Sequence, residues 1–290
     1  MISRRGLLAG SLLAGPALLS LPAAADDRGG ALQRGVADLE RRHGGRLGVA
    51  VLDSASGKLF AHRGDERFAL CSTSKFLTIA FVLARVDRRQ ESLARRIVYS
   101  KDDLVAYSPI TERHVGGGGL TVGEVCAAAM TVSDNTAENL LLDSLGGPTA
   151  LTGALRSLGD GVTRLDRRET ALNEARPGDP RDTTTPAAML GILRGAVLGT
   201  MLSAPSRERL TAWLIANETG GERLRAGVPN GWRVGDKTGS GGNNAANDIA
   251  VIWPPGRAPI IVTAYYAESG AADGERNAVL AEVGRLAAAV

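Results

Sequence analysis

The chain has 290 residues, enough for one large domain, or two interlocked smaller ones, with a sizeable hydrophobic core. Hydrophobic residues make up 44% and charged residues 22%, which is ordinary for a globular protein. A formal charge of only +3, from 34 basic and 31 acidic residues, gives no reason to expect nucleic acid or an anionic membrane as a partner.

Residues 1–25 have the pattern of an export signal. Arg4 and Arg5 precede an apolar stretch rich in alanine and leucine, and three alanines then supply the small residues that a signal peptidase needs. The arginine pair is typical of the twin-arginine route. The alternative, a membrane anchor, is disfavoured because the apolar part is short. We therefore expect an exported protein, periplasmic or secreted, whose mature part is residues 26–290.

The first elements expected after this segment are a helix and a pair of strands. The pattern is helical over residues 31–42, and residues 48–53 form an apolar strand. A turn at residues 54–57 allows residues 59–61 to return as a second strand. Helix-like segments then dominate from about residue 72 to residue 217.

Strand character returns near the end of the chain. Residues 249–253 and 260–266 are apolar and are separated by the turn sequence Pro-Pro-Gly-Arg, which predicts an antiparallel hairpin. The chain then ends with apolar residues spaced 4, 3 and 4 apart, the pattern of an amphipathic helix: Val279, Val283, Leu286 and Val290.

Strands at both ends and helices between them predict an α/β (α+β) fold. An antiparallel sheet built from the N- and C-terminal segments would be flanked by helices, with an all-helical lobe inserted. We place the α/β lobe of a single catalytic domain at about residues 26–65 and 215–290, and the helical lobe at about residues 66–214. An active-site cleft is expected between the lobes, because pockets favour such junctions.

Ser72 begins the sequence Ser-Thr-Ser-Lys, at the start of an apolar stretch expected to be a buried helix. Lys75 follows three residues later, so the two side chains would share one helix face. Serine is a weak nucleophile until a neighbouring base takes its proton, which a lysine of lowered pKa can do. The helix N-terminus would also offer N–H groups to an oxyanion. On its own this pattern is weak evidence for catalysis, because a helix N-cap residue followed by a surface lysine gives the same sequence.

Two further short motifs follow in chain order. Ser-Asp-Asn at residues 133–135 reads as a loop before a helix over residues 136–145, for which Asp134 is also a good N-cap. Lys-Thr-Gly-Ser at residues 237–240 precedes the terminal hairpin and fits an edge strand. Its cation and hydroxyls suit a carboxylate, and its glycine would let a ligand approach the backbone.

In combination, the three motifs resemble the set found in class A β-lactamases and penicillin-binding proteins. Each motif occurs once, in order, on an element that suits it. The resemblance extends to residues 103–109, 163–169, 172–179 and 181–186, and so covers essentially the whole mature chain. It implies the fold of this family, a β-lactamase and D,D-peptidase-like fold.

Glu169 and Asn173 decide between the two groups. Penicillin-binding proteins release their acyl-enzyme very slowly, because nothing activates water against the ester. In class A enzymes a glutamate and an asparagine on an Ω-shaped loop hold that water, and these two residues match them. Alternatively, Glu169 could be a solvated carboxylate among Arg164, Arg167 and Arg168. That interpretation does not explain why the residues around Glu169 also resemble class A segments.

The resemblance also implies the roles of the other site residues. Ser72 would be the nucleophile, and the N–H groups of Ser72 and Ser240 would form the oxyanion hole. Whether Lys75 or Glu169 takes the proton of Ser72 stays open. The implied catalytic residues are Ser72, Lys75, Ser133, Glu169 and Asn173. The implied substrate-binding residues are Tyr107, Asn135, Arg223, Lys237, Thr238, Gly239 and Ser240.

Two charged contacts are implied as well. Class A enzymes need a second cation near Lys237 for the substrate carboxylate, and Arg223 stands where one subgroup has it. The alternative for Arg223 is a loop arginine in solvent. An ion pair between Arg167 and Asp182 would close the Ω-shaped loop, so that Asp182→Asn should slow deacylation before it abolishes folding.

The two cysteines, Cys71 and Cys126, are expected to be buried free thiols, which behave as small apolar residues. Some class A enzymes bridge Cys126 to position 79, and others bridge Cys71 to position 241. Ile79 and Gly241 stand at those places, so neither disulfide can form.

The sequence thus predicts a monomeric class A β-lactamase that needs no cofactor and confers β-lactam resistance. Its expected partners are penicillins, cephalosporins and mechanism-based inhibitors, with no nucleic acid and no stable membrane association. The alternative is a D,D-peptidase or β-lactam sensor that acylates without rapid turnover. A zinc hydrolase is disfavoured, because His43, His62 and His114 lack paired-ligand spacing.

Overall fold

The computed structural model describes residues 27–290, so the expected export signal lies outside the described residues. The α-helices of this part are α1 (Asp27–His43), α2 (Ser74–Asp87), α3 (Val122–Thr131), α4 (Asn135–Leu145), α5 (Gly147–Ser157), α6 (Pro186–Val197), α7 (Ala204–Ile215), α8 (Leu224–Gly227) and α9 (Asp273–Ala288). Within residues 27–290, no helix combines the length and the apolar character needed to cross a membrane.

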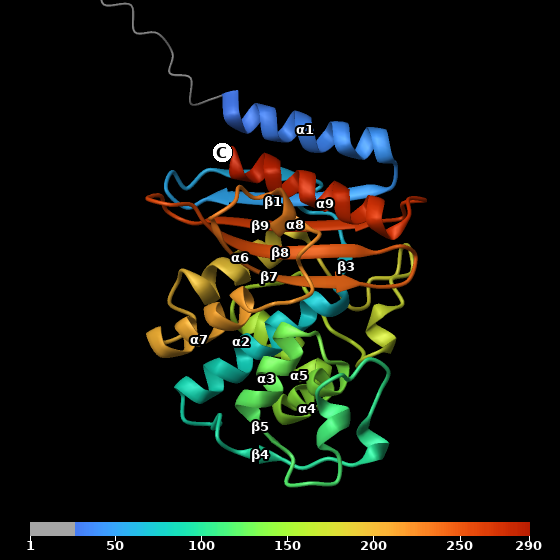
Figure 1. Cartoon of the computed structure of the whole chain (residues 1–290), viewed down its shortest axis with the longest axis vertical. Coiled ribbons are helices and arrows are strands. Elements are labelled where there is room, and N and C mark those ends of the chain that lie inside the picture. Colours follow the sequence, from blue (N-terminus) through green and yellow to red (C-terminus); the bar gives the residue numbers. More distant parts are fainter. Residues whose placement is uncertain (1–26) are drawn as a thin grey trace, which may run out of the picture.

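A five-stranded antiparallel sheet joins the two ends of the chain (Figure 1). In spatial order its strands are β2 (Leu59–His62), β1 (Arg46–Asp53), β9 (Ile260–Ala267), β8 (Ala246–Trp253) and β7 (Arg233–Ser240). The central strand β9 pairs with β1 along its whole length, from Arg46 opposite Ala267 to Asp53 opposite Ile260. The predicted sheet from distant segments, the β8–β9 hairpin and the edge position of β7 are all confirmed.

Short strands and 3₁₀ turns connect these elements. The short pairs are β3 (Phe68–Ala69) with β6 (Thr183–Thr184), and β4 (Arg96–Ile97) with β5 (Leu120–Thr121). The 3₁₀ turns are η1 (Cys71–Thr73), η2 (Lys101–Asp103), η3 (Thr111–His114) and η4 (Ala171–Asn173).

The sheet is covered on both faces, which explains why its inner strands β1 and β9 are nearly continuous apolar runs. Val49 and Val51 of β1 belong to one buried cluster, which α1 and α9 close on the outer side. Ala50 and Leu52 point the other way, into a larger cluster formed with α2 to α7. Figure 1 shows α1 and α9 on one side of the sheet and the remaining long helices on the other.

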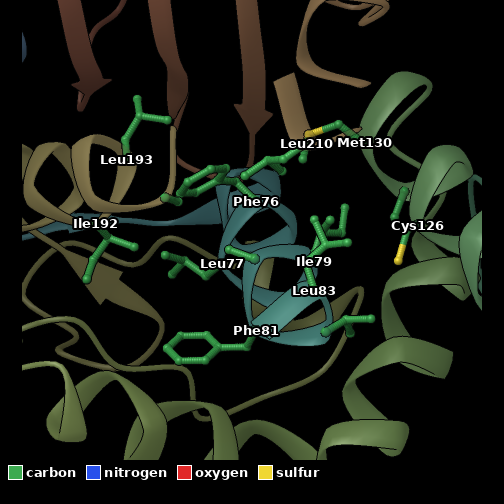
Figure 2. Packing of buried hydrophobic residues seen from close by; sticks show 14 of the residues in the cluster. Phe76, Leu77, Ile79, Phe81, Leu83, Cys126, Met130, Ile192, Leu193 and Leu210 are labelled. Carbon is green, nitrogen blue, oxygen red and sulfur yellow. The ribbon is translucent and has the colours of Figure 1, made fainter. Parts of the chain in front are cut away.

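Helix α2 lies at the centre of the larger cluster and is buried on all sides from Ser74 to Ala84, as expected of a largely apolar helix surrounded by protein. Phe76, Leu77 and Ile79 have no exposed surface, and side chains from α3, α6 and α7 surround them (Figure 2). The sequence placed Ser72 at the start of this helix. In the structure η1 precedes it, and α2 itself begins two residues later, at Ser74.

Asp134 links the start of α4 to the preceding loop. Its Oδ1 accepts hydrogen bonds from the backbone N–H of Ala137 (2.9 Å) and the hydroxyl of Thr111 (2.8 Å). Its Oδ2 accepts from the N–H groups of Ile110 (3.0 Å) and Thr111 (2.9 Å). The predicted N-cap is confirmed, and the same carboxylate also holds the loop that carries Tyr107.

We expect Asp134→Ala to lower the free energy of unfolding by about 2–4 kcal/mol, because it removes a helix cap and leaves several buried donors without an acceptor. Thr185→Ala is the control, since Thr185 caps α6 through a single bond to the N–H of Ala188, and should cost about 1 kcal/mol. Urea denaturation measures both. Equal losses would show that the loop contacts of Asp134 add no stability.

Candidate active site

Lys75 joins three groups of the site through one ammonium. Its Nζ donates hydrogen bonds to Ser72 Oγ (2.8 Å) and Asn135 Oδ1 (2.9 Å), and it pairs with Glu169 Oε1. The predicted proximity of the Ser72 and Lys75 side chains is therefore confirmed, although Ser72 lies in η1 and not on α2. The side chains of Lys75 and Glu169 have no exposed surface. Burial makes this ion pair depend on both partners, since either charge alone would be strongly destabilised.

Two asparagines hold Glu169 in place. Asn139, on α4, accepts from the backbone N–H of Glu169 (2.9 Å) and donates to its carbonyl (3.0 Å). Asn173, in η4, donates from Nδ2 to Glu169 Oε2 (2.5 Å). The Oδ1 of Asn173 is buried and has no hydrogen-bond partner among the described residues. Hydrogen bonds from these asparagines thus hold both the backbone and the carboxylate of Glu169.

Ser133 and Lys237 form the opposite wall of the site. Lys237 Nζ donates to Ser133 Oγ (3.1 Å) and to the carbonyl of Thr238 (2.9 Å). Lys237 has no exposed surface, and burial together with the nearby charge of Lys75 lowers its pKa to about 7. Ser133, in the loop before α4, has a φ of 60°, in the left-handed region.

The edge strand β7 passes close to the nucleophile. A Cβ added at Gly239 would lie 3.1 Å from the carbonyl oxygen of Leu70 and 3.2 Å from the backbone N of Ser72. Glycine therefore allows the approach of β7 to η1 that the sequence predicted from the Lys-Thr-Gly motif. This approach brings the backbone of Ser240 to the same side as the backbone of Ser72.

Arg223 lies beneath the end of β7 rather than in solvent. Its Nη1 donates to the carbonyls of Gly239 and Asn247 (both 2.8 Å), and its Nη2 donates to Ser240 Oγ (2.7 Å). Asn277 of α9 accepts from its Nε (2.9 Å). Burial lowers the pKa of Arg223 from its ordinary value. Its guanidinium is thus positioned beside the hydroxyl of Ser240, as the functional interpretation requires.

These residues surround a cleft of about 310 Å³. Tyr107 lies at its rim with 60% of its surface exposed, on a backbone held by a bond from the N–H of Asn135 to the Tyr107 carbonyl (3.0 Å). The residues that line the cleft are Ser72, Tyr107, Ser133, Asn135, Asn173, Thr219, Arg223, Thr238, Gly239 and Ser240. Lys75, Glu169 and Lys237 lie buried behind this lining and complete the predicted set.

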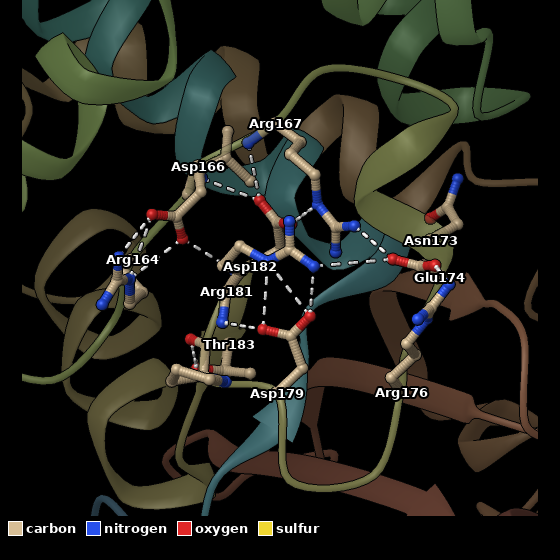
Figure 3. A network of polar contacts seen from close by, with 12 residues as sticks. Arg164, Asp166, Arg167, Asn173, Glu174, Arg176, Asp179, Arg181, Asp182 and Thr183 are labelled. Carbon is tan, nitrogen blue, oxygen red and sulfur yellow. Dashed lines mark hydrogen bonds and ion pairs between the residues drawn. The ribbon is translucent and has the colours of Figure 1, made fainter.

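The segment between Arg164 and Thr183, which we call the Ω loop, is held by a network of ion pairs (Figure 3). Arg167 pairs with Asp182 (2.5 Å) and with Glu174 (2.5 Å). The fully buried carboxylate of Asp182 also accepts from the backbone N–H groups of Asp166 (2.7 Å) and Arg167 (2.9 Å). The predicted Arg167–Asp182 ion pair is therefore confirmed.

Both cysteines are free and buried, as predicted. Burial raises the pKa of the Cys71 thiol to about 12, so it is not a nucleophile at neutral pH. A Cβ at Gly241 would lie 2.6 Å from Cys71 Sγ, which shows that the two positions face each other. Because residue 241 is a glycine, Cys71 has no thiol opposite it with which to form a disulfide.

Four site residues were not predicted from the sequence. Asn139 holds the backbone of Glu169, Asn247 and Asn277 hold Arg223, and Thr219 shares a 2.5 Å hydrogen bond with Thr238. Asn139 carries the one available signal, since it lies one turn after Asn135 on the same face of α4. The others come from distant segments, with no spacing to mark them.

A serine next to a buried lysine and carboxylate, at the base of an open cleft, is the arrangement of a serine hydrolase that works through an acyl-enzyme. The family model described as the β-lactamase enzyme family matches residues 31–290. β-Lactamase CTX-M-25 of Escherichia coli is 46% identical over 283 residues, which is 98% of this chain and 96% of that protein.

Two further comparisons also match this chain to β-lactamases. β-Lactamase L2 of Stenotrophomonas maltophilia is 50% identical over 87% of this chain and 83% of that protein. A solved structure of an ancestral Gram-negative class A β-lactamase is 65% identical, with a TM-score of 0.87 over 88% of this chain and 98% of that one. The chain belongs to the class A β-lactamases, and it is a β-lactam hydrolase with the α/β fold that the sequence predicted.

We expect Asp182→Asn to loosen the Ω loop, because the buried Arg167 contact loses its charge and an amide N–H₂ faces the two backbone donors. Such a loss should cost about 2–4 kcal/mol of stability. Hydrogen exchange of residues 164–183 and urea denaturation measure it. Asp143→Asn is the control, because Asp143 pairs with Arg168 on the surface, 52% exposed. Unchanged protection of the loop in Asp182→Asn would contradict the assigned role.

Proposed function

We propose that this chain hydrolyses penicillins and cephalosporins through an acyl-enzyme on Ser72, with Glu169 as the base that activates water. The observation that carries the proposal is the position of Lys75, whose single ammonium contacts both Ser72 Oγ and the Glu169 carboxylate. One hydrogen-bonded chain therefore links the nucleophile to a carboxylate that can accept protons.

In acylation, Ser72 Oγ would attack the lactam carbonyl and lose its proton to Lys75, once Lys75 has passed a proton to Glu169 and become a neutral amine, or to Glu169 through water. The negative charge that develops on the carbonyl oxygen would be held by the N–H groups of Ser72 and Ser240. Such a donor contributes about 3–4 kcal/mol to lowering the barrier. Ser133, beside Lys237, is placed to relay the proton to the leaving nitrogen as the lactam C–N bond breaks.

In deacylation, Glu169 and Asn173 would hold a water molecule for attack on the ester. The geometry supports this, because Asn173 donates to one carboxylate oxygen while its own Oδ1 remains an unused acceptor. Glu169 would accept one proton from the water as its oxygen bonds to the ester carbon. The ester C–O bond to Ser72 then breaks, the proton returns to Ser72 Oγ, and the ring-opened acid is released.

For substrate binding, we propose that the carboxylate common to penicillins and cephalosporins is held by a group of positive charge and hydroxyls at the end of β7. This group comprises Arg223, Lys237, Thr238 and Ser240. Asn135 and the free edge of β7 at Gly239 and Ser240 would bind the acylamino side chain. Tyr107, exposed at the rim, would pack against the substrate's ring.

We further propose that the protein acts as an exported monomer. The Arg4-Arg5 pair and the apolar stretch after it support export by the twin-arginine route to the periplasm or beyond. The chain keeps all its catalytic groups in one polypeptide, so a monomer suffices for the reaction.

A D,D-peptidase or β-lactam sensor, the alternative considered from the sequence, would share the three short motifs. The contacts of Glu169 with Lys75 and Asn173 favour turnover, since they supply the general base that a slowly deacylating enzyme lacks. The rate of deacylation distinguishes a β-lactamase from a D,D-peptidase or a sensor.

We expect the protein to consume a large excess of benzylpenicillin with little surviving adduct on Ser72. Glu169→Gln should convert it into a protein that accumulates that adduct, with turnover lowered by about 10²–10⁴, the usual contribution of a general base. Mass spectrometry during steady-state mixing measures both quantities.

The control for this experiment is Glu112→Gln, which makes the same change of charge on an exposed residue that does not line the cleft. It should leave turnover and adduct unchanged. If the unsubstituted protein stops near one equivalent of drug with a persistent adduct, it is a peptidase or sensor. Fast turnover by Glu169→Gln would remove Glu169 from the mechanism.

We expect the KM for benzylpenicillin to rise as pH increases from 6 to 9. Burial lowers the pKa of Lys237 to about 7, so this lysine is charged below pH 7 and loses its attraction for the substrate carboxylate above it. Lys237→Arg, which stays charged throughout this range, should flatten the rise. Steady-state kinetics at each pH measures the effect, and a KM that is constant with pH would contradict it.

A further inference from the structure

A second cavity, of about 340 Å³, lies on the far side of the Ω loop from the nucleophile. The Ω loop contributes residues 175–181 to its lining, and the other walls come from the start of β1, from β3 and from the end of β9. None of the residues that line the catalytic cleft lines this cavity. The mechanism proposed above does not use it.

The lining of this cavity is rich in arginine. Its charged residues are Arg46, Arg67, Arg167, Arg176 and Arg181 against Glu66, Asp179 and Glu268. Arg46 is fully engaged, because it pairs with Glu66 and Glu268 (both 2.9 Å) and stacks on the ring of Phe68. The remaining arginines therefore decide what the cavity can bind.

Three of these arginines share one carboxylate (Figure 3). Glu174 Oε2 lies 2.5 Å from Arg167 and 3.7 Å from Arg181, and its Oε1 lies 2.5 Å from Arg176. Glu174 is the only carboxylate in residues 27–290 that pairs with Arg176, whose side chain is 68% exposed.

Arg67 adds a fourth guanidinium to the same cavity. It donates to the carbonyl of Val162 (3.0 Å) and to Thr183 Oγ1 (2.9 Å), and no carboxylate of the described chain pairs with it. Arg181 has a second carboxylate in Asp179 (2.6 Å), and Arg167 has one in Asp182 (2.5 Å). The four guanidinium groups on this side therefore have three carboxylates among the described residues, and Arg67 and Arg176 are the least engaged.

We propose that this cavity is a binding site for a small anion with several carboxylates, held by Arg67 and Arg176. A guanidinium presents a planar pair of donors that matches a carboxylate in a two-bond contact. The cavity volume, at the lower end for small-molecule sites, suits a ligand the size of citrate.

Such a ligand would act on the catalytic loop through Glu174. An anion that takes Arg176 removes the partner of Glu174 Oε1, and Arg181 at 3.7 Å is a distant second partner of Oε2. The contact of Glu174 with Arg167 is thereby strengthened, and it spans the segment that carries Glu169 and Asn173. We therefore expect occupancy to change deacylation without blocking the cleft. This coupling rests on the proposed role of Glu169, whereas the binding itself does not.

The binding test measures the melting temperature of the full chain against citrate concentration, with ionic strength held constant by sodium chloride. A ligand that binds only the folded state should give a saturable rise of about 2–4 °C. In the double variant Arg67→Gln and Arg176→Gln, the apparent affinity should fall about tenfold or more. The control double variant, Arg88→Gln with Arg113→Gln, removes two exposed arginines elsewhere and should retain the rise.

Two results would overturn binding at this cavity. A rise that does not saturate and is equal in both double variants would mean that citrate stabilises the protein only through exclusion from its surface. The other is competition at the catalytic cleft, whose own cations also suit a carboxylate. In that case citrate raises the KM for benzylpenicillin, leaves kcat unchanged and does so equally in both double variants.

Kinetics then tests the coupling. We expect citrate to change kcat with a half-maximal concentration that matches the melting curves, and to do so in the control but not in the Arg67→Gln, Arg176→Gln variant. A saturable melting shift with no change in kcat would keep the site and refute the coupling. A failed Glu169→Gln experiment would remove the proposed mechanism while leaving the melting result intact.

Discussion

The buried contact between Lys75 and Glu169 constrains most of what surrounds it. Neither side chain has exposed surface, so each charge is stable there only because the other is present. Lys75 sits on α2, which the hydrophobic core encloses, whereas Glu169 comes from a loop nearly a hundred residues later in the chain. The loop must therefore be brought to the helix and kept there, and the polar network of the Ω loop meets this requirement. Asn139 binds the backbone of Glu169, and Asp182 binds Arg167, which precedes Glu169 by two residues.

Apolar packing sets the other half of the geometry. The sheet is buried on both faces, and its outer face rests on the first and last helices, so the edge strand β7 has a fixed position relative to α2. The site lies where that edge approaches η1, and Gly239 permits the approach because a side chain there would meet Leu70 and Ser72. Lys237, Arg223 and Ser133 then converge from three different elements. The charges of Lys237 and Arg223 are desolvated by the same packing that positions them, which is why burial dominates the shift in the pKa of each.

Several parts of this arrangement were predictable because they depend on local spacing. Ser72 and Lys75 are three apart and share a face whatever the rest of the chain does, and Asp134 caps a helix that begins one residue later. The alternation of β1 between two cores follows from its own sequence. The start of α2 was less predictable, since the 3₁₀ turn at Ser72 reflects how η1 packs against β7 and not a property of its own residues.

The sequence by itself determined the order of elements and the class of the fold, because periodicity encodes these within a few residues. Its short motifs, through their resemblance to class A β-lactamases, also indicated the candidate catalytic groups. Tertiary structure alone decided which polar side chains meet across long separations. Asn277 holds Arg223 from 54 residues away, and Asn139 holds Glu169 from 30 residues away. The arginine-lined cavity behind the Ω loop likewise exists only once β1, β3 and the end of β9 face that loop. Such contacts depend on distances that folding creates, and no local pattern specifies them.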